Sequence, residues 1–155
     1  MGKTKSTTIL VFISFAAILG FAGSAFAYES GIIKTVRGQV RIERGGSNLE
    51  ARVGVPVYER DRVIVQDASS VGISMSDETL LSIGRNSTLV IDKYSYDPVT
   101  REGQVATSIL KGTLRYVTGL IGRARPQAIK ITTNNATIGI RGTEFIVEVP
   151  DENKK

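Results

Sequence analysis

Residues 131–149 read ITTNNATIGIRGTEFIVEV. Apolar side chains alternate with polar ones in two runs of this stretch, at Ala136, Ile138 and Ile140 and then at Phe145, Val147 and Val149. Such alternation is typical of β-strands with one face in a core and the other in water. The triplet Arg141-Gly142-Thr143 separates the runs, so the stretch predicts two strands that meet at a tight corner.

The same alternation recurs through the chain before this stretch. Residues 33–42 predict a strand with one wet face, and residues 53–57 predict a short strand that Pro56 confines to an edge. Short apolar runs begin near residues 61, 71, 79 and 88, and residues 106–118 alternate despite Gly112. No segment has helical periodicity. We therefore expect an all-β fold, a single compact twisted β-roll or short β-solenoid of short strands, with a β-sandwich as the alternative.

The first 27 residues have the pattern of a signal peptide. Met-Gly-Lys-Thr-Lys is a basic start, residues 9–23 are apolar, and Ser24-Ala25-Phe26-Ala27 ends in a small-residue cleavage motif. The alternative is an uncleaved membrane anchor, but the apolar run is shorter than the roughly 20 residues that a spanning helix needs. We expect cleavage after Ala27, a periplasmic or secreted protein without a membrane span, an all-β domain at residues 28–149 and a polar tail at residues 150–155.

Composition limits the chemistry of the mature chain. Cleavage would leave 155 − 27 = 128 residues and remove Lys3 and Lys5, so 18 basic residues would face 15 acidic ones, a net charge of +3. The chain has neither cysteine nor histidine, which leaves out disulfides, the usual general base and the commonest transition-metal ligand. We therefore expect a non-enzymatic protein without a metal or other cofactor.

Five short pieces in a fixed order connect the chain to a known family. They are Val36-Arg37-Gly38-Gln39-Val40, Arg60-Asp61-Arg62-Val63-Ile64-Val65, the pair of residues 77–83 and 87–91, Leu110-Lys111-Gly112-Thr113-Leu114-Arg115, and residues 131–133 with 138–145. Over residues 32–149 the chain resembles the FecR domain family, named for a periplasmic regulator of ferric citrate transport. It departs from that pattern at Arg60, Glu78 and Asn134, which are expected turn positions. The iron-regulating members of the family have a cytoplasmic anti-sigma segment and a membrane helix before this domain. Here only a short basic region precedes the apolar segment, so we expect a stand-alone domain and carry over no anti-sigma activity.

The corner at Arg141-Gly142-Thr143 has a structural and a functional interpretation. In the structural one, which we favour, Gly139 and Thr143 belong to the strand motif, Gly142 adopts a positive φ, and Arg141 binds a carboxylate such as Asp61 or Asp77. In the functional one, Arg141 contacts an anion or a partner protein.

Basic residues gather in sequence around an irregular stretch at residues 119–126, which we expect to be a mobile loop, as we do the turn-rich residues 94–103. The candidates for a binding surface are Arg115, Arg123, Arg125 and Lys130, with Tyr116 beside them. They could meet phosphate-bearing polymers or lipids. Because no aromatic residues interleave with them as in a stacking platform, solvated loop charges are the favoured interpretation, and we expect no nucleic-acid partner.

Several acidic residues could in principle hold calcium or act as a pair in glycoside hydrolysis. They are Asp61, Asp67, Asp77, Glu78, Asp92 and Asp97. Their spacing fits no calcium loop, and no aromatic sugar platform accompanies them, so solvated turns are the favoured interpretation.

The expected function is that of a binding or scaffold module that mediates protein–protein interaction in the bacterial cell envelope. Exposed strand edges would let a partner protein, or a second copy in a homo-oligomer, add a strand. Two alternatives remain open: a sensor or signalling domain related to iron-transport regulation, and a binder of envelope polysaccharide.

Overall fold

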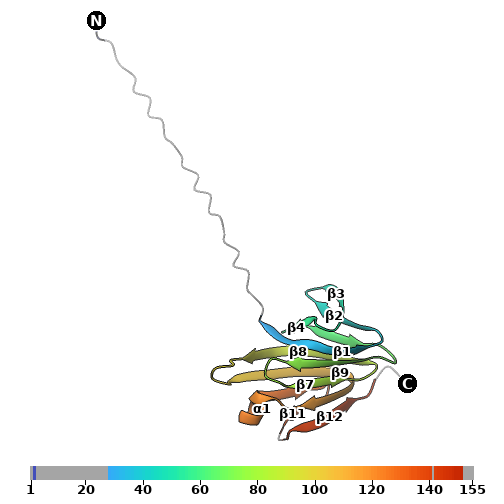
Figure 1. The fold of residues 1–155 in the computed structure, drawn as a ribbon. Coiled ribbons are helices and arrows are strands. Elements are labelled where there is room, and N and C mark those ends of the chain that lie inside the picture. The colour runs from blue at the N-terminus through green and yellow to red at the C-terminus, as the bar shows by residue number, and fades with distance from the viewer. Residues whose placement is uncertain (1, 3–27, 141, 152–155) are drawn as a thin grey trace.

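A computed structural model describes residues 2, 28–140 and 142–151 of the chain (Figure 1). The strands are β1 (Glu29–Arg37), β2 (Val40–Arg44), β3 (Ser47–Glu50), β4 (Pro56–Tyr58), β5 (Arg62–Val65), β6 (Ser70–Met75), β7 (Leu80–Ile83), β8 (Ser87–Tyr96), β9 (Gly103–Val117), β10 (Ile129–Thr132), β11 (Thr137–Gly139) and β12 (Glu144–Val149). Helix α1 (Leu120–Ala124) and the 3-10 turn η1 (Pro126–Ala128) lie between β9 and β10.

The strands form one continuous curled sheet, which confirms the prediction of an all-β twisted roll. Its main path runs β3-β2-β5-β8-β9-β7-β6-β1-β4. Strands β10 and β12 pair with the remaining edge of β9, and β11 extends β10. The pairing of β10 with β9 is parallel, and the other pairings are antiparallel.

The long strand β9 holds the two halves of the roll together. Residues 103–111 pair with β8, whereas residues 112–117 pair with β12 and, over 114–117, with β7. Gly112 separates the two parts with a φ of 88°, and a Cβ at this position would collide with the side chain of Ser87. Only glycine adopts this conformation without strain, so Gly112 is the corner at which β9 passes from one half to the other.

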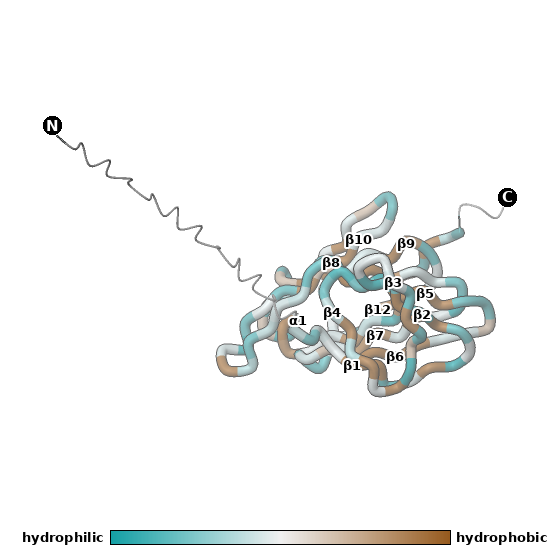
Figure 2. The backbone as a smooth tube through the Cα atoms, turned by 90° about the horizontal axis from the view of Figure 1, so that it is seen from above, coloured by the Kyte–Doolittle hydropathy of each residue, from teal (hydrophilic) through white to brown (hydrophobic). Residues whose placement is uncertain are grey.

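The core lies inside the curl and takes apolar side chains from both halves. Ile33, Ile42, Leu89, Ile109 and Leu114 have no exposed surface. Buried residues alternate with more exposed ones along β6 and β7, as expected for a sheet with one buried face. Figure 2 shows hydrophobic and hydrophilic stretches interspersed along the folded chain.

Tyr116 belongs to this core. It is fully buried, and its ring stacks on that of Phe145 with 5.0 Å between the ring centroids. The prediction that Tyr116 takes part in a binding surface was therefore wrong, because its parity on β9 places the ring inside the roll.

Three local predictions also need correction. Residues 33–42 form two strands, because Gly38 breaks the run with a φ of 71°. Residues 94–96 belong to β8 and pair with the start of β9, and residues 119–126 contain the one-turn helix α1. The prediction for Pro56 is confirmed, since β4 ends the sheet.

Most of the predicted signal peptide, at residues 1 and 3–27, lies outside the described residues, as do residues 152–155. In the part of the chain that is described, no helix has the length and apolar character needed to cross a membrane.

Candidate binding cleft

Asp61, one of the two carboxylates proposed as partners of Arg141, is fully buried and has a different partner. Arg44 donates to it from Nε to Oδ1 at 2.8 Å and from Nη2 to Oδ2 at 2.7 Å, and the Tyr58 amide donates at 2.9 Å. The Arg44 guanidinium also lies 4.4 Å from the centroid of the Tyr58 ring. The hydrogen bond that Arg44 donates to Asp61 raises the pKa of Arg44 above its ordinary value. Arg44 thus provides the contact expected of Arg141, which itself lies outside the described residues.

Asp77 is also fully buried, and neutral groups hold its carboxylate. Thr79 donates from Oγ1 at 2.8 Å, the Tyr94 hydroxyl donates at 3.2 Å, and the Ile121 amide donates at 3.4 Å. The Asp77 amide in turn donates to the Tyr94 hydroxyl at 2.8 Å. For Asp61 and Asp77 the expectation of solvated turns was therefore wrong, because both side chains turn inward and tie separate parts of the chain together.

The Asp77 turn also positions the start of α1. The Leu120 amide donates to the Asp77 carbonyl at 2.7 Å, and the Gly119 amide donates to Thr79 Oγ1 at 3.1 Å. A side chain on Gly119 would collide with the Asp77 carbonyl, so the two backbones approach as closely as glycine allows. The turn after β6 therefore fixes both Tyr94 and α1.

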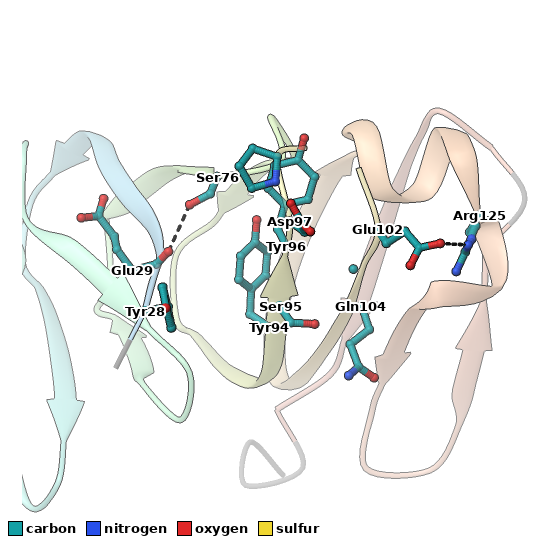
Figure 3. Close-up of a pocket in the computed structure, with 12 residues that line it drawn as sticks. Tyr28, Glu29, Ser76, Tyr94, Ser95, Tyr96, Asp97, Glu102, Gln104 and Arg125 are labelled. Atoms are coloured by element: carbon teal, nitrogen blue, oxygen red, sulfur yellow. Dashed lines mark hydrogen bonds and ion pairs between the residues drawn. The ribbon is translucent and has the colours of Figure 1, made fainter. Parts of the chain in front are cut away.

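Tyr94 and Arg125, the residue that follows α1, line an open cleft of about 980 Å³ at one end of the roll (Figure 3). The start of β1, the turn after β6, the paired ends of β8 and β9 and the residue after α1 surround it. Its lining residues are Tyr28, Glu29, Ser76, Tyr94, Ser95, Tyr96, Asp97, Pro98, Glu102, Gly103, Gln104 and Arg125.

The aromatic residues of the cleft come from two distant parts of the chain. Tyr94 and Tyr96 lie on β8, whereas Tyr28 precedes β1 and is 92% exposed. Figure 3 shows Tyr28 and Glu29 on one side of Tyr94, with Glu102 and Arg125 on the other. Of the acidic residues considered for calcium or glycoside chemistry, Asp97 alone lines the cleft, and it shares this lining with the three tyrosines.

Three of the polar side chains of the cleft, those of Tyr94, Asp97 and Glu102, have partners within the protein. Burial raises the pKa of Tyr94 well above its ordinary value, and the nearby Asp77 adds to this shift. The amides of Val99 and Thr100 donate to Asp97 and hold the pKa of this carboxyl below its ordinary value. Arg125 forms an ion pair with Glu102. The cleft therefore offers aromatic surface with a fixed pattern of charges.

The predicted basic residues lie in different settings. Arg115 pairs with Glu144 at 2.7 Å, Arg123 on α1 donates to the Thr118 carbonyl at 3.3 Å, and Lys130 is exposed on β10. Of these residues, Arg125 alone lines the cleft. A polyanion surface made by the others stays a prediction.

Two of the corner residues, Gly142 and Thr143, contact the residue that follows β9. Thr118 donates its hydroxyl to the Gly142 carbonyl at 3.0 Å and its amide to the Thr143 carbonyl at 2.8 Å. Gly139 pairs with Lys130 between β11 and β10. Among the described residues, no group of three or more acidic side chains is arranged to hold a metal ion.

The sequence analysis did not single out the cleft tyrosines. Tyr94-Ser95-Tyr96 does have the alternation of a strand that presents two rings on one face, and this signal was available. Nothing local connects that strand to Tyr28, because strand pairing across the roll creates the neighbourhood.

Comparison with known proteins gives one family and one solved structure. The chain matches no curated protein. A solved structure titled "Cell surface anchoring domain" is similar with a TM-score of 0.38 and 26% sequence identity, over 39% of this chain and 82% of that one. The family model described as "FecR protein" matches residues 61–155, which is more than half of the chain. The chain therefore belongs to the FecR family, as its motifs indicated.

Proposed function

We propose that this FecR-family chain is an exported, non-enzymatic binding module that contacts another protein of the bacterial cell envelope. The cleft formed by Tyr28, Tyr94 and Tyr96 is the contact site. The observation that carries the proposal is the cleft itself, because open concave sites that combine aromatic surface with a few fixed polar groups are typical of recognition sites.

The state of the polar groups favours recognition over catalysis. The Tyr94 hydroxyl is bound to Asp77, Glu102 is paired with Arg125, and Asp97 accepts hydrogen bonds from its own turn. A general acid or base needs a free position facing the substrate, whereas these groups serve to shape and charge a surface.

The position of Tyr28 links the cleft to export. Cleavage after Ala27 makes Tyr28 the first residue of the mature protein and places its new α-ammonium group at the mouth of the cleft. The mature N-terminus is then part of the contact site, and the protein acts in the periplasm or outside the cell.

Two other functions have an observation in their favour. Tyrosine rings beside carboxylates also suit the apolar faces and hydroxyl edges of sugars, which supports an envelope-polysaccharide binder. Membership of the FecR family supports a sensor or signalling domain related to iron transport.

Photo-crosslinking in the native bacterium tests the proposal. A benzophenone amino acid replaces Tyr96 in the cleft, and the matched control carries it at the exposed Leu49 on β3. We expect a protease-sensitive adduct with an envelope protein from position 96 and none from position 49. N-terminal sequencing of the exported protein should begin at Tyr28.

Other outcomes would contradict the proposal in identifiable ways. Equal adducts at both positions would show that the cleft is not the contact site. Adducts that resist protease but are removed by glycan hydrolases would favour the polysaccharide binder. An adduct with a transport receptor that forms only with ferric citrate present would favour the sensor.

A further inference from the structure

We infer that the partner enters the cleft as an added β-strand, which pairs with the outer edge of β8 at Tyr94–Tyr96, and that this segment carries a positive charge. The inference rests on the proposed function, because it describes how the same cleft holds its partner.

The first support is the pairing pattern of β8. Strand β5 covers the edge of β8 that faces away from β9, but its pairing stops at Val90. Strand β9 continues along the other edge as far as Tyr96. The last part of β8 is therefore covered by a strand on one side only.

The second support is the direction of the backbone groups. The Tyr94 amide donates to Glu59 Oε2 at 3.2 Å, and so points away from β9. The Asp97 amide donates to the Glu102 carbonyl at 2.8 Å, toward β9. In an antiparallel strand, the N–H and C=O groups of one residue point to the same edge, as do those of the residue two positions further on. The Tyr94 carbonyl and both backbone groups of Tyr96 therefore point away from β9. Within the described part of the chain, no backbone group pairs with these three.

The third support is that this edge opens into the cleft. Glu59 follows Tyr58, and Tyr58 is the partner in register of Glu29 at the start of β1. The Glu29 carbonyl accepts a hydrogen bond from Ser76 Oγ at 3.1 Å, which holds the far side of the cleft in place. Figure 3 shows Tyr28 and Glu29 across from Tyr94. An extended segment between β1 and β8 thus meets both the free edge and the rings.

The fourth support is charge. Three carboxylates line the cleft, at Glu29, Asp97 and Glu102, and Arg125 is engaged with the last of them. Glu59 adds a fourth carboxylate at the edge itself; it is 39% exposed, and its Oε1 lies 4.0 Å from Nε of the exposed Arg60. Charged groups on an edge discourage random strand pairing, and they favour a segment with a lysine or arginine at the matching position.

Main-chain hydrogen bonds give strand addition a signature that other binding modes lack. Only every second residue of an added strand pairs with the edge, and side chains of alternate residues enter pockets. Blocking the amides of a bound peptide one by one therefore distinguishes an added strand from a segment held by its side chains alone.

For the test, the protein is expressed from the full chain, and ten-residue peptides that bind it are selected from a random displayed library. The best binder is then synthesised with single N-methyl groups at successive backbone amides. We expect losses of about tenfold or more at alternate amides and little change at those between, since a hydrogen bond of about 1.4 kcal/mol corresponds to a factor of ten. The peptide should also slow hydrogen exchange at the Tyr96 amide.

The expected positive charge of the bound segment is tested with two matched substitutions, one in the turn after β8 and one on β8 itself. Asp97→Asn should lower affinity several-fold and weaken its salt dependence. Asp92→Asn is the control, because Asp92 is exposed on β8 outside the cleft and bonds to Ser108 at 2.6 Å. Equal effects of the two substitutions would contradict the expected charge.

The failure of this inference can be told apart from that of the proposed function. If position 96 still crosslinks to a protein but N-methylation shows no alternation and Tyr96 is unprotected, strand addition is wrong and the contact site stands. If no peptide is selected while soluble peptidoglycan fragments bind and Tyr96→Ala abolishes that binding, both proposals fail.

Discussion

Asp61 and Asp77 make an instructive pair, because both carboxylates are fully buried in turns of the same roll and yet they are satisfied by different chemistry. Asp61 faces the guanidinium of Arg44, which keeps 33% of its side-chain surface exposed. Among the described residues, Asp77 is held by the neutral donors of Thr79, Tyr94 and the Ile121 amide. The first is an ion pair at the edge of the core, and the second is a network of neutral donors inside it.

The difference shows what each carboxylate does for the fold. The Asp61 pair joins the end of β2 to the turn after β4, two neighbouring parts of the sheet. The Asp77 network joins the turn after β6, the end of β8 and the start of α1, and two of these parts border the candidate cleft. A buried donor that loses its acceptor costs more unfolding free energy than an exposed donor, which water can satisfy. Asp77 should therefore matter more for stability than Asp61.

The largest effect is expected for Asp77→Ala. The substitution leaves the Thr79 hydroxyl and the Ile121 amide without an acceptor in the interior, which should cost about 4 kcal/mol of unfolding free energy. Urea unfolding followed by circular dichroism measures this change. Glu78→Ala, at the exposed neighbour in the same turn, is the control and should cost much less. A loss similar to that of the control would show that the network is not a structural tie.

A smaller loss is expected for Asp61→Ala, about 2 kcal/mol. The Tyr58 amide loses its acceptor, but water can reach the partly exposed Arg44 and replace part of the ion pair. The same urea experiment compares the two aspartates directly. A loss of unfolding free energy larger than that of Asp77→Ala would mean that the ion pair stabilises the fold more than the Asp77 network does.

The smallest effect is expected for Tyr94→Phe, about 1 kcal/mol near neutral pH. This substitution removes one hydroxyl from the Asp77 network and leaves the other donors in place. A loss equal to that of Asp77→Ala would mean that the tyrosine hydroxyl, and not the buried carboxylate, holds the network together.

The same variant has a pH signature. The folded-state pKa of Tyr94 is raised by burial, so its contribution to stability is complete below the ordinary tyrosine value of about 10 and is lost as the pH rises toward the folded value. The pKa of Tyr116 is also raised by burial, but Tyr116 is present in both proteins. The stability difference between wild type and Tyr94→Phe should therefore shrink in urea unfolding at about pH 11. An unchanged difference would contradict the raised pKa of Tyr94.

Local patterns in the sequence were enough to predict the fold class and several of its boundaries. Alternation is a property of neighbouring residues, so the all-β class and the two strands around residues 141–143 followed from it. Pro56 lacks an amide hydrogen, and β4 indeed ends the sheet. The family motifs are local as well, and the match to the FecR model agrees with them.

Long-range pairing decided everything that makes the candidate site. Asp61 finds Arg44 across 17 residues, and Asp77 meets the Ile121 amide across 44. The sequence suggested Arg141 for this task because a fork-shaped guanidinium is well suited to tying loops to a carboxylate. Only the docking of one turn against another selects the donor that reaches it.

The cleft likewise depends on long-range pairing, whereas some properties of its residues depend on the local sequence. By itself, the sequence determined that the chain forms an all-β roll and that Gly112 interrupts an alternating run, whereas it predicted a loop at Tyr94 and Tyr96. The tertiary structure alone decided that β9 turns at Gly112, that Tyr28 meets β8 across the open end, and that β5 stops short of Tyr94. The physical reason is that strand alternation depends on residues two apart, whereas a cleft and a free edge depend on where strands far apart in the chain begin and end their pairing.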